Sequence, residues 1–199
     1  VPTWLTGVIL ICCLMAVVMG GLKRLANIAT SLVPIMSIFY VVVGLLVILL
    51  NIQQVPEVIK EIFTQAFSMK AVAGGTGGYV IARAMQYGIT RGMYSNEAGE
   101  GTAPFAHGSA IVDHPCEEGI TGVTEVFLDT IIICSITAIV IGVTGIYQSD
   151  LSPAVMAIES FGTVWGPLKH LATFALLLFC FTTLMGQWFN AAKSFTYAF

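Results

Sequence analysis

Residues 32–50 read LVPIMSIFYVVVGLLVILL, an apolar run without a charged side chain. A helix needs about 20 mainly apolar residues to cross the hydrocarbon core of a bilayer. Similar runs occur at residues 126–143 and 171–189, and residues 4–19 form a slightly shorter one. We therefore expect the fold to be built on membrane-spanning helices.

The overall composition predicts the same fold class. Of the 199 residues, 57% are hydrophobic and only 10% are charged, whereas a soluble domain carries about 25% charged residues. These values exclude an aqueous globular protein and predict an all-α, polytopic transmembrane protein whose main partner is the lipid bilayer. The net charge of -3 is small and its charges are scattered, so no nucleic-acid partner is expected.

The apolar runs and their polar flanks predict one transmembrane domain over residues 1–199. The chain begins and ends beside apolar runs, which indicates an internal piece of a longer protein. Lys23 and Arg24 place the end of the first helix in the cytoplasm by the positive-inside tendency, and the following helices then alternate in direction. The expected helices are 3–22, 32–50, 71–90 with a break, 119–142 and 168–194, with interfacial segments at 56–67 and 95–112 and a further interfacial helix within 144–167.

A cluster of glycines interrupts the weakest of these crossings. Residues 74–78 read GGTGG, and each glycine lowers helix stability by about 1 kcal/mol relative to alanine. Broken backbone at membrane depth is tolerated where it lines a cavity, and its freed amides and carbonyls can bind a small zwitterion or a cation. Close helix packing is the alternative, because small residues are also favoured at helix contacts. On the first interpretation Gly75, Thr76 and Gly78 are candidate substrate-binding residues.

Two acids lie within the fourth expected helix. Glu125 and Asp129 are four residues apart, so both carboxylates lie on one helix face. Acids inside a membrane are expensive and are often ion sites or proton relays. Glu125 is nearer the start of the helix, where the amide dipole and interfacial water reduce that cost. Asp129 is therefore the stronger functional candidate.

The last expected helix carries adjacent hydroxyls and an amphipathic cluster. Thr182 and Thr183 can bond to carbonyls of their own helix, but hydroxyl oxygens are also ligands for a hard cation such as sodium. Gln187 and Trp188 follow at the inner half, where an interfacial belt is an equally good explanation.

Few other residues indicate a metal-binding or catalytic site. His107, Asp113 and His114 have irregular spacing, so no metal other than sodium and no further cofactor is expected. The cysteines lack metal-ligand spacing and are expected to be buried thiols. The chain contains no catalytic motif, which argues against an enzyme.

The most unusual stretch is residues 87–104, YGITRGMYSNEAGEGTAP, because lipid burial does not explain its polar residues and glycines. Together with GGLKRLA at 20–26, VPIMSIFY at 33–40 and FLDT at 127–130, it resembles the bacterial and archaeal sodium:alanine (alanine or glycine:cation) symporters. The resemblance runs from about Gly20 to Gly145 and continues more weakly to the last helix. The family's amino-terminal segment has no counterpart in this chain.

The resemblance implies part of a leucine-transporter-like fold with two inverted repeats. Residues 71–89 would be the broken helix that opens the second repeat. Gly75, Thr76 and Gly78 would contact the substrate, Gln187 and Trp188 would line the opposite wall, and Thr182 and Thr183 would bind sodium. An inner gate or hinge would comprise Arg91, Ser95, Asn96 and Glu97.

Three positions depart from the family pattern. Thr76 stands where phenylalanine is frequent, Gly186-Gln187-Trp188 replaces a Gly-Trp-Ser pattern, and Glu125 replaces a small residue. A more polar pocket favours a substrate with its own hydrogen-bonding groups. The resulting prediction is symport of sodium with a small neutral amino acid, alanine or glycine, across a prokaryotic inner (cell) membrane. The alternative is a non-transporting membrane subunit or a channel-like protein.

Overall fold

The computed structural model describes residues 3–66, 77–95 and 101–198, and within these ranges all regular secondary structure is helical, with no strand. The longer helices are α1 (Thr3–Val18), α2 (Gly21–Leu50), α3 (Val55–Ala66), α4 (Gly77–Ser95), α6 (Pro115–Val126), α7 (Ser135–Thr144) and α9 (Gly166–Ala198). Between them lie α5 (Ala103–His107), the π-helix η2 (Phe127–Cys134), the 3-10 turn η3 (Ile146–Gln148) and α8 (Pro153–Gly162).

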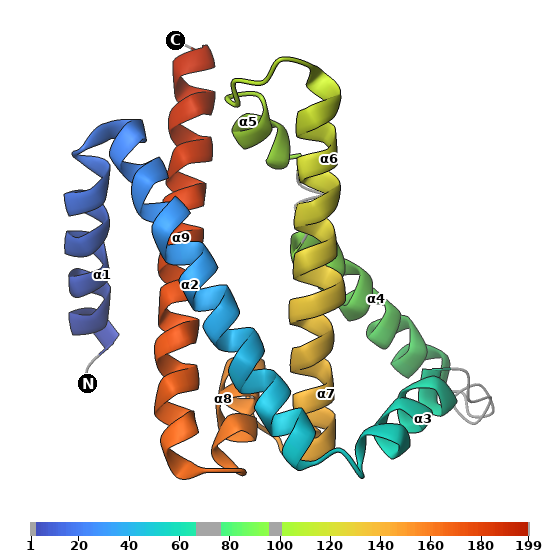
Figure 1. Ribbon diagram of the computed structural model, residues 1–199. Helices are drawn as coiled ribbons and strands as arrows, with labels where there is room; N and C mark the ends of the chain where they lie inside the picture. Colours follow the sequence, from blue (N-terminus) through green and yellow to red (C-terminus); the bar gives the residue numbers. More distant parts are fainter. Residues whose placement is uncertain (1–2, 67–76, 96–100, 199) are drawn as a thin grey trace.

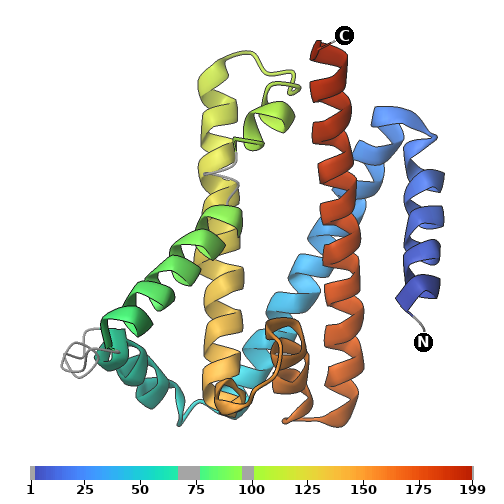
Figure 2. The same cartoon turned by 180° about the vertical axis from the view of Figure 1, so that it is seen from behind.

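Three continuous helical segments in the described part of the chain are long and apolar enough to cross a membrane: Lys23–Leu50, Pro115–Thr144 and Gly166–Ala198. The expectation of an all-α, polytopic membrane protein is confirmed. Figures 1 and 2 show these three segments running along the long dimension of the molecule, with α1 beside α2 and α9. At 16 residues, α1 is shorter than the other three.

Figure 1 shows α2 and the segment from α6 to α7 running in one direction along the molecule, and α1 and α9 running in the opposite direction. Figure 1 shows α3 and α8 at one end of the molecule, and the turn from α1 to α2, α5 and the carboxyl end of α9 at the other. We call the second of these the inner end, because it carries Lys23, Arg24 and Lys193 and the positive-inside tendency predicts that it faces the cytoplasm.

The buried core lies where α2, α7, α8 and α9 meet. Tyr40 of α2 packs edge-on against Phe161 and Phe179, with ring centroids 5.5 and 5.7 Å apart. Its phenol is paired with the Thr137 hydroxyl at 2.7 Å, which satisfies both polar groups away from water. The other buried members are Val47, Ile136, Val140, Leu168, Ala172 and Ala175. This cluster fixes α9 against α2 and α7.

The second helix begins at Gly21, well before the expected start at 32. Gly21 has a φ of 74°, a left-handed value that suits glycine, and this allows a tight reversal directly after α1. A long polar connector is therefore unnecessary. Pro34 consequently lies inside α2, and prolines are tolerated within membrane helices because neighbouring groups satisfy the freed carbonyl.

Other predicted boundaries also moved. The helix expected at 119–142 begins at Pro115, ends at Thr144 and contains η2, while the helix expected at 168–194 extends over Gly166–Ala198. An interfacial segment was expected at 95–112. In this range the structure describes the last residue of α4 and the short helix α5. Residues 56–67 correspond to α3, and the interfacial helix within 144–167 corresponds to α8. Of the glycine cluster at 74–78 that was expected to break the helix at 71–90, residues 74–76 lie outside the described residues, whereas Gly77 and Gly78 form the start of α4, which continues to Ser95.

The prediction of buried cysteines is wrong, because all five thiols are exposed. The reason is that each helix buries only a narrow stripe. Only 22% of the most apolar window of α2, and 22% of that of α9, is covered by the described chain.

Candidate functional site

The end of α4 meets the middle of the continuous segment formed by α6, η2 and α7. Ser95, the last residue of α4, donates its hydroxyl to Oδ2 of Asp129 at 2.5 Å. These two residues were predicted separately, one as part of a gate and the other as an intramembrane acid. The structure brings them together across a sequence separation of 34 residues.

The π-helix explains why Ser95 contacts two side chains of its partner. Backbone hydrogen bonds in a π-helix link residues five apart, and short π segments are frequent at functional sites. Asp129 and Cys134 are five apart in η2, and the Ser95 oxygen lies 3.9 Å from the Cys134 sulfur. The local widening therefore presents a carboxylate and a thiol to the end of α4.

The remaining gate residues are only partly placed. Arg91 is exposed on α4, one turn before Ser95, whereas Asn96 and Glu97 lie outside the described residues. Of the proposed gate, Ser95 accordingly has established contacts, with Asp129 and with Cys134.

The paired hydroxyls of α9 both bond to their own helix. Thr182 and Thr183 donate to the carbonyl oxygen of Phe179, each at 2.9 Å. A hydroxyl that donates one hydrogen bond still has lone pairs on its oxygen. The arrangement therefore fits both interpretations of these residues, local backbone satisfaction and cation binding.

The structure describes one predicted wall of the substrate site in full and the other only in part. On α9, Gln187 is exposed and Trp188 is half-buried, one turn beyond Thr183. On the other wall, Gly78 belongs to the first turn of α4, while Gly75 and Thr76 lie outside the described residues. Substrate contacts by these residues remain a prediction.

Glu125 has a partner that was not predicted. Its Oε2 lies 3.2 Å from Nε2 of His107 in α5, and Nδ1 of the same imidazole lies 2.6 Å from Oε1 of Glu118. Both carboxylates belong to α6 and are seven residues apart, or about two helical turns. Two glutamates at that spacing, with a histidine in the preceding polar segment, are the sequence pattern from which this cluster could have been predicted.

The electrostatics of the cluster favour a protonated imidazole. The hydrogen bond to Glu118 is the largest influence that raises the pKa of His107 above its usual 6.5. Partial burial acts in the opposite direction, and the charges of Glu125 and Glu118 add to the increase. His107 was discounted as a metal ligand, and in the described part of the chain no group of three metal-ligating side chains could hold a metal ion.

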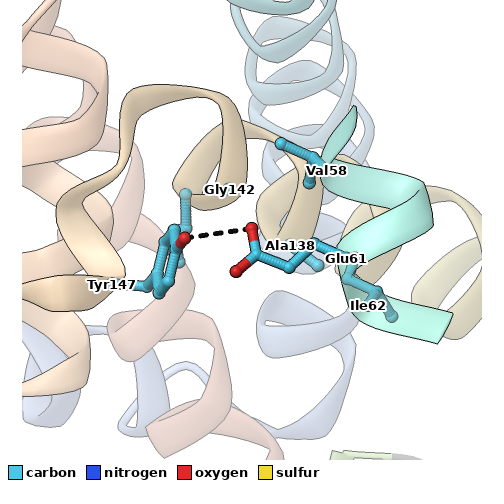
Figure 3. Close-up of a pocket in the computed structure, with 7 residues that line it drawn as sticks. Val58, Glu61, Ile62, Ala138, Gly142 and Tyr147 are labelled. Carbon is cyan, nitrogen blue, oxygen red and sulfur yellow. Dashed lines mark hydrogen bonds between the residues drawn. The ribbon is translucent and has the colours of Figure 1, made fainter. Parts of the chain in front are cut away.

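A separate pocket of about 420 Å³ lies at the other end of the molecule, between α3 and α7. Figure 3 shows Val58 and Ile62 of α3 facing Ala138 and Gly142 of α7, with Tyr147 beside them. The Tyr147 phenol donates to the Glu61 carboxylate at 3.1 Å. The pocket is lined by other residues than the predicted substrate and sodium ligands, so it is distinct from the candidate site.

The sequence matches a known family along its whole length. The model of the sodium:alanine symporter family covers residues 1–199. An uncharacterized transporter of Haemophilus influenzae is 37% identical over 99% of this chain and 44% of its own length. A sodium/alanine symporter, AgcS, of Methanococcus maripaludis is 33% identical over 97% of this chain and 43% of its own length.

A third relative carries a different substrate in its name. The probable sodium/glutamine symporter GlnT of Bacillus subtilis is 34% identical over 92% of this chain and 38% of its own length. The chain thus spans less than half the length of these relatives. Together with the match over every residue, the similarity gives a direct assignment: this chain belongs to the sodium:alanine symporter family.

Proposed function

We propose that the full-length protein containing this chain couples inward movement of sodium to uptake of a small neutral amino acid by alternating access. The observation that carries the proposal is the family match over residues 1–199. Relatives are named for sodium with alanine and for sodium with glutamine. The protein is accordingly a transporter rather than an enzyme, in the inner membrane of a prokaryote.

The proposed site would be built from residues 75–78, at and just before the start of α4, and from residues 182–188 of α9. The backbone of Gly75, Thr76 and Gly78 and the hydroxyl of Thr76 would hold the substrate. Gln187 and Trp188 would line the opposite wall. Thr182 and Thr183 would bind sodium through oxygens whose hydrogens are already directed at the Phe179 carbonyl. Because Thr76 and Gln187 would make this proposed site polar, alanine, glycine and glutamine are the substrates to compare.

Sodium coupling is tested with the full-length protein in proteoliposomes. Uptake of labelled alanine, glycine and glutamine is measured with a gradient of sodium and again with choline in its place. We expect uptake of at least one of them to require sodium and to saturate. Equal uptake in choline would refute the coupling, and a pore would conduct without exchanging its solute in counterflow.

The sodium site is tested through Thr183. A contact to a charged group contributes about 1.5 kcal/mol or more, and each 1.4 kcal/mol is a factor of about ten. We therefore expect Thr183→Ala to raise the sodium concentration for half-maximal uptake by about tenfold, and Thr183→Ser to restore it. Thr173 makes the same bond to its own helix, to the carbonyl of Lys169 at 2.8 Å. Thr173→Ala should therefore leave the sodium dependence unchanged.

A further inference from the structure

The carboxylates of Glu118 and Glu125 hold the imidazole of His107 from both sides. One nitrogen faces Glu118 at 2.6 Å and the other faces Glu125 at 3.2 Å. The ring also lies against the backbone of α6, because a Cβ placed on Gly122 would meet its Cε1 and Nε2 at 3.6 Å. Gly122 lies between the two acids, so the ring bridges two turns of α6.

The contact is sensitive to a single proton because each of the two ring nitrogens faces a carboxylate. A protonated histidine donates from both nitrogens and is positively charged, whereas a neutral one donates from only one. Glu118 and Glu125 carry like charges on the same side of α6, so a cation between them also relieves their repulsion. Protonation therefore strengthens both contacts, and loss of the proton removes at least one.

The location of α5 gives the contact a structural consequence. Figures 1 and 2 show α5 at the inner end, between the ends of α6 and α9, and α5 packs against α9. It follows α4, the helix that carries the proposed gate, in the chain. Holding α5 on α6 thus keeps a segment in place across the inner ends of two long helices.

We propose that His107, Glu118 and Glu125 form a proton-operated latch that fastens α5 to α6 at the inner end. The latch is closed when His107 is protonated and is released when it is neutral. Its role as a regulator of solute release rests on the proposed transport function, but the latch itself does not.

Other charges near α5 do not replace these partners. On α6, Glu117 lies beside Glu118 in the first turn, and His114 caps the helix by accepting a hydrogen bond from the Cys116 amide at 3.2 Å. On α9, the charge toward this end is Lys193, whose ammonium lies 5.7 Å from the centroid of the Phe189 ring. The charges that act on the pKa of His107 are those of Glu125 and Glu118.

The sign of the pH dependence follows from this pKa. Folding and docking raise the pKa of His107 above 6.5. The stabilisation is therefore fully present below pH 6.5 and is lost as the pH rises through the raised value. The latch should be closed in mildly acidic solution and open in alkaline solution.

The latch is tested by a distance measurement that needs neither sodium nor substrate. Spin labels are placed at Ala106 of α5 and Thr121 of α6, both exposed, in the full-length protein in lipid nanodiscs with its other cysteines replaced. Distances are recorded from about pH 5.5 to about pH 9, a range that spans histidine titration. We expect a narrow, short distribution at low pH and a longer, broader one at high pH.

Variants separate the latch from other causes. His107→Gln should abolish the pH dependence, His107→Lys should keep the short distance throughout, and Glu118→Gln should move the transition to lower pH, more than Glu125→Gln does. The matched control His114→Gln should leave the transition unchanged. The latch is refuted by a transition that survives His107→Gln or that His114→Gln removes, and equally by an α5–α6 distance that never changes with pH.

A second measurement tests the link to transport. Uptake into proteoliposomes should slow at acidic internal pH, and His107→Lys should keep it slow at alkaline internal pH. A pH-dependent distance without this effect would confirm the latch and refute its regulatory role. Absence of any sodium-driven uptake would instead refute the proposed function and leave the distance result standing.

Discussion

The Ser95 hydroxyl joins α4 to η2 through a hydrogen bond to the Asp129 carboxylate, beside a longer contact with the Cys134 thiol. A carboxylate inside an apolar segment needs a donor, because an unsatisfied charge at membrane depth is strongly unfavourable. Ser95 supplies that donor from a helix end, where a small rotation of α4 can withdraw it. The pair is therefore suited to the hinge role proposed for Ser95.

This pair should behave as a unit when it is mutated. Ser95→Ala removes the donor and Asp129→Ala removes the acceptor, so each should lower the melting temperature of the full-length protein. Residues in direct contact show interaction energies of about 0.5–3 kcal/mol in double-mutant cycles. We expect the double variant to be no less stable than Asp129→Ala alone, measured by thermal unfolding in detergent.

The comparison pair is Thr173→Ala with Asp129→Ala, because the Thr173 hydroxyl bonds within α9 and does not share a partner with Asp129. Its effects should add. An additive result for Ser95 and Asp129 as well would show that their hydrogen bond does not contribute to stability. Asp129→Asn keeps an acceptor, so it separates loss of the hydrogen bond from loss of the charge.

At the scale of the helices, Gly44 sets the spacing of α2 and α7. A Cβ at this position would approach Cγ2 of Ile136 to 2.3 Å, which is too close for either helix to remain in place. Ile136 is buried and β-branched, so its methyl group has little freedom to move. Small residues at helix contacts have this role in membrane proteins, where packing drives helix association.

Gly44→Ala should consequently destabilise the protein. Overpacking costs about 1–3 kcal/mol, while alanine recovers up to about 1 kcal/mol of helix propensity. We expect a lower melting temperature in detergent for the full-length variant. Gly7→Ala in α1 is the control, since a Cβ there would meet nothing within 4 Å and only the gain in propensity applies. Equal melting temperatures for the two variants would contradict the proposed close contact.

The sequence predicts the existence of these helices better than their ends or irregularities. Apolar length alone identified the runs at 32–50, 126–143 and 171–189, because a helix needs that length to cross the bilayer. The start of α2 was missed because Lys23 and Arg24 were read as part of a connector, whereas one left-handed glycine makes the turn. The π-helix was missed because its sequence, FLDTIIIC, is compatible with an ordinary helix.

The same limit applies to the candidate site. The functional interest of Asp129 could be predicted, because an acid in an apolar run is itself a signal. Its contact with Ser95 could not, since that pairing depends on how α4 packs against η2. His107 was rejected as a metal ligand because of its irregular spacing, but that reason does not apply to contacts with carboxylates. Its spacing is unsuitable for a metal, yet two glutamates two turns apart suit an imidazole.

Across the whole molecule, large apolar side chains remain exposed on every long helix. Phe174 is 59% exposed and Leu49 is 64% exposed. Such surfaces are compatible with acyl chains and also with packing against further helices, and the Haemophilus influenzae relative is more than twice as long as this chain.

The arrangement of the two ends makes the orientation in the membrane testable. Cys116 lies in the first turn of α6, at the end that carries Lys23, Arg24 and Lys193, while Gln53 lies in the turn between α2 and α3 at the opposite end. Both side chains are exposed. Positively charged loops are retained in the cytoplasm. Cys116 should therefore be cytoplasmic and position 53 should be external.

Single-cysteine variants of the full-length protein measure this directly with a membrane-impermeant maleimide. We expect Gln53→Cys, with every native cysteine replaced, to react in intact cells. Cys116 as the sole cysteine should react only after the cells are permeabilised. Tyr197→Cys, near the carboxyl end of α9 and 94% exposed, should behave like Cys116, because both lie at the same end. Rapid labelling of Cys116 in intact cells would reverse the orientation and place the His107 latch on the external side, where external rather than internal pH would control it.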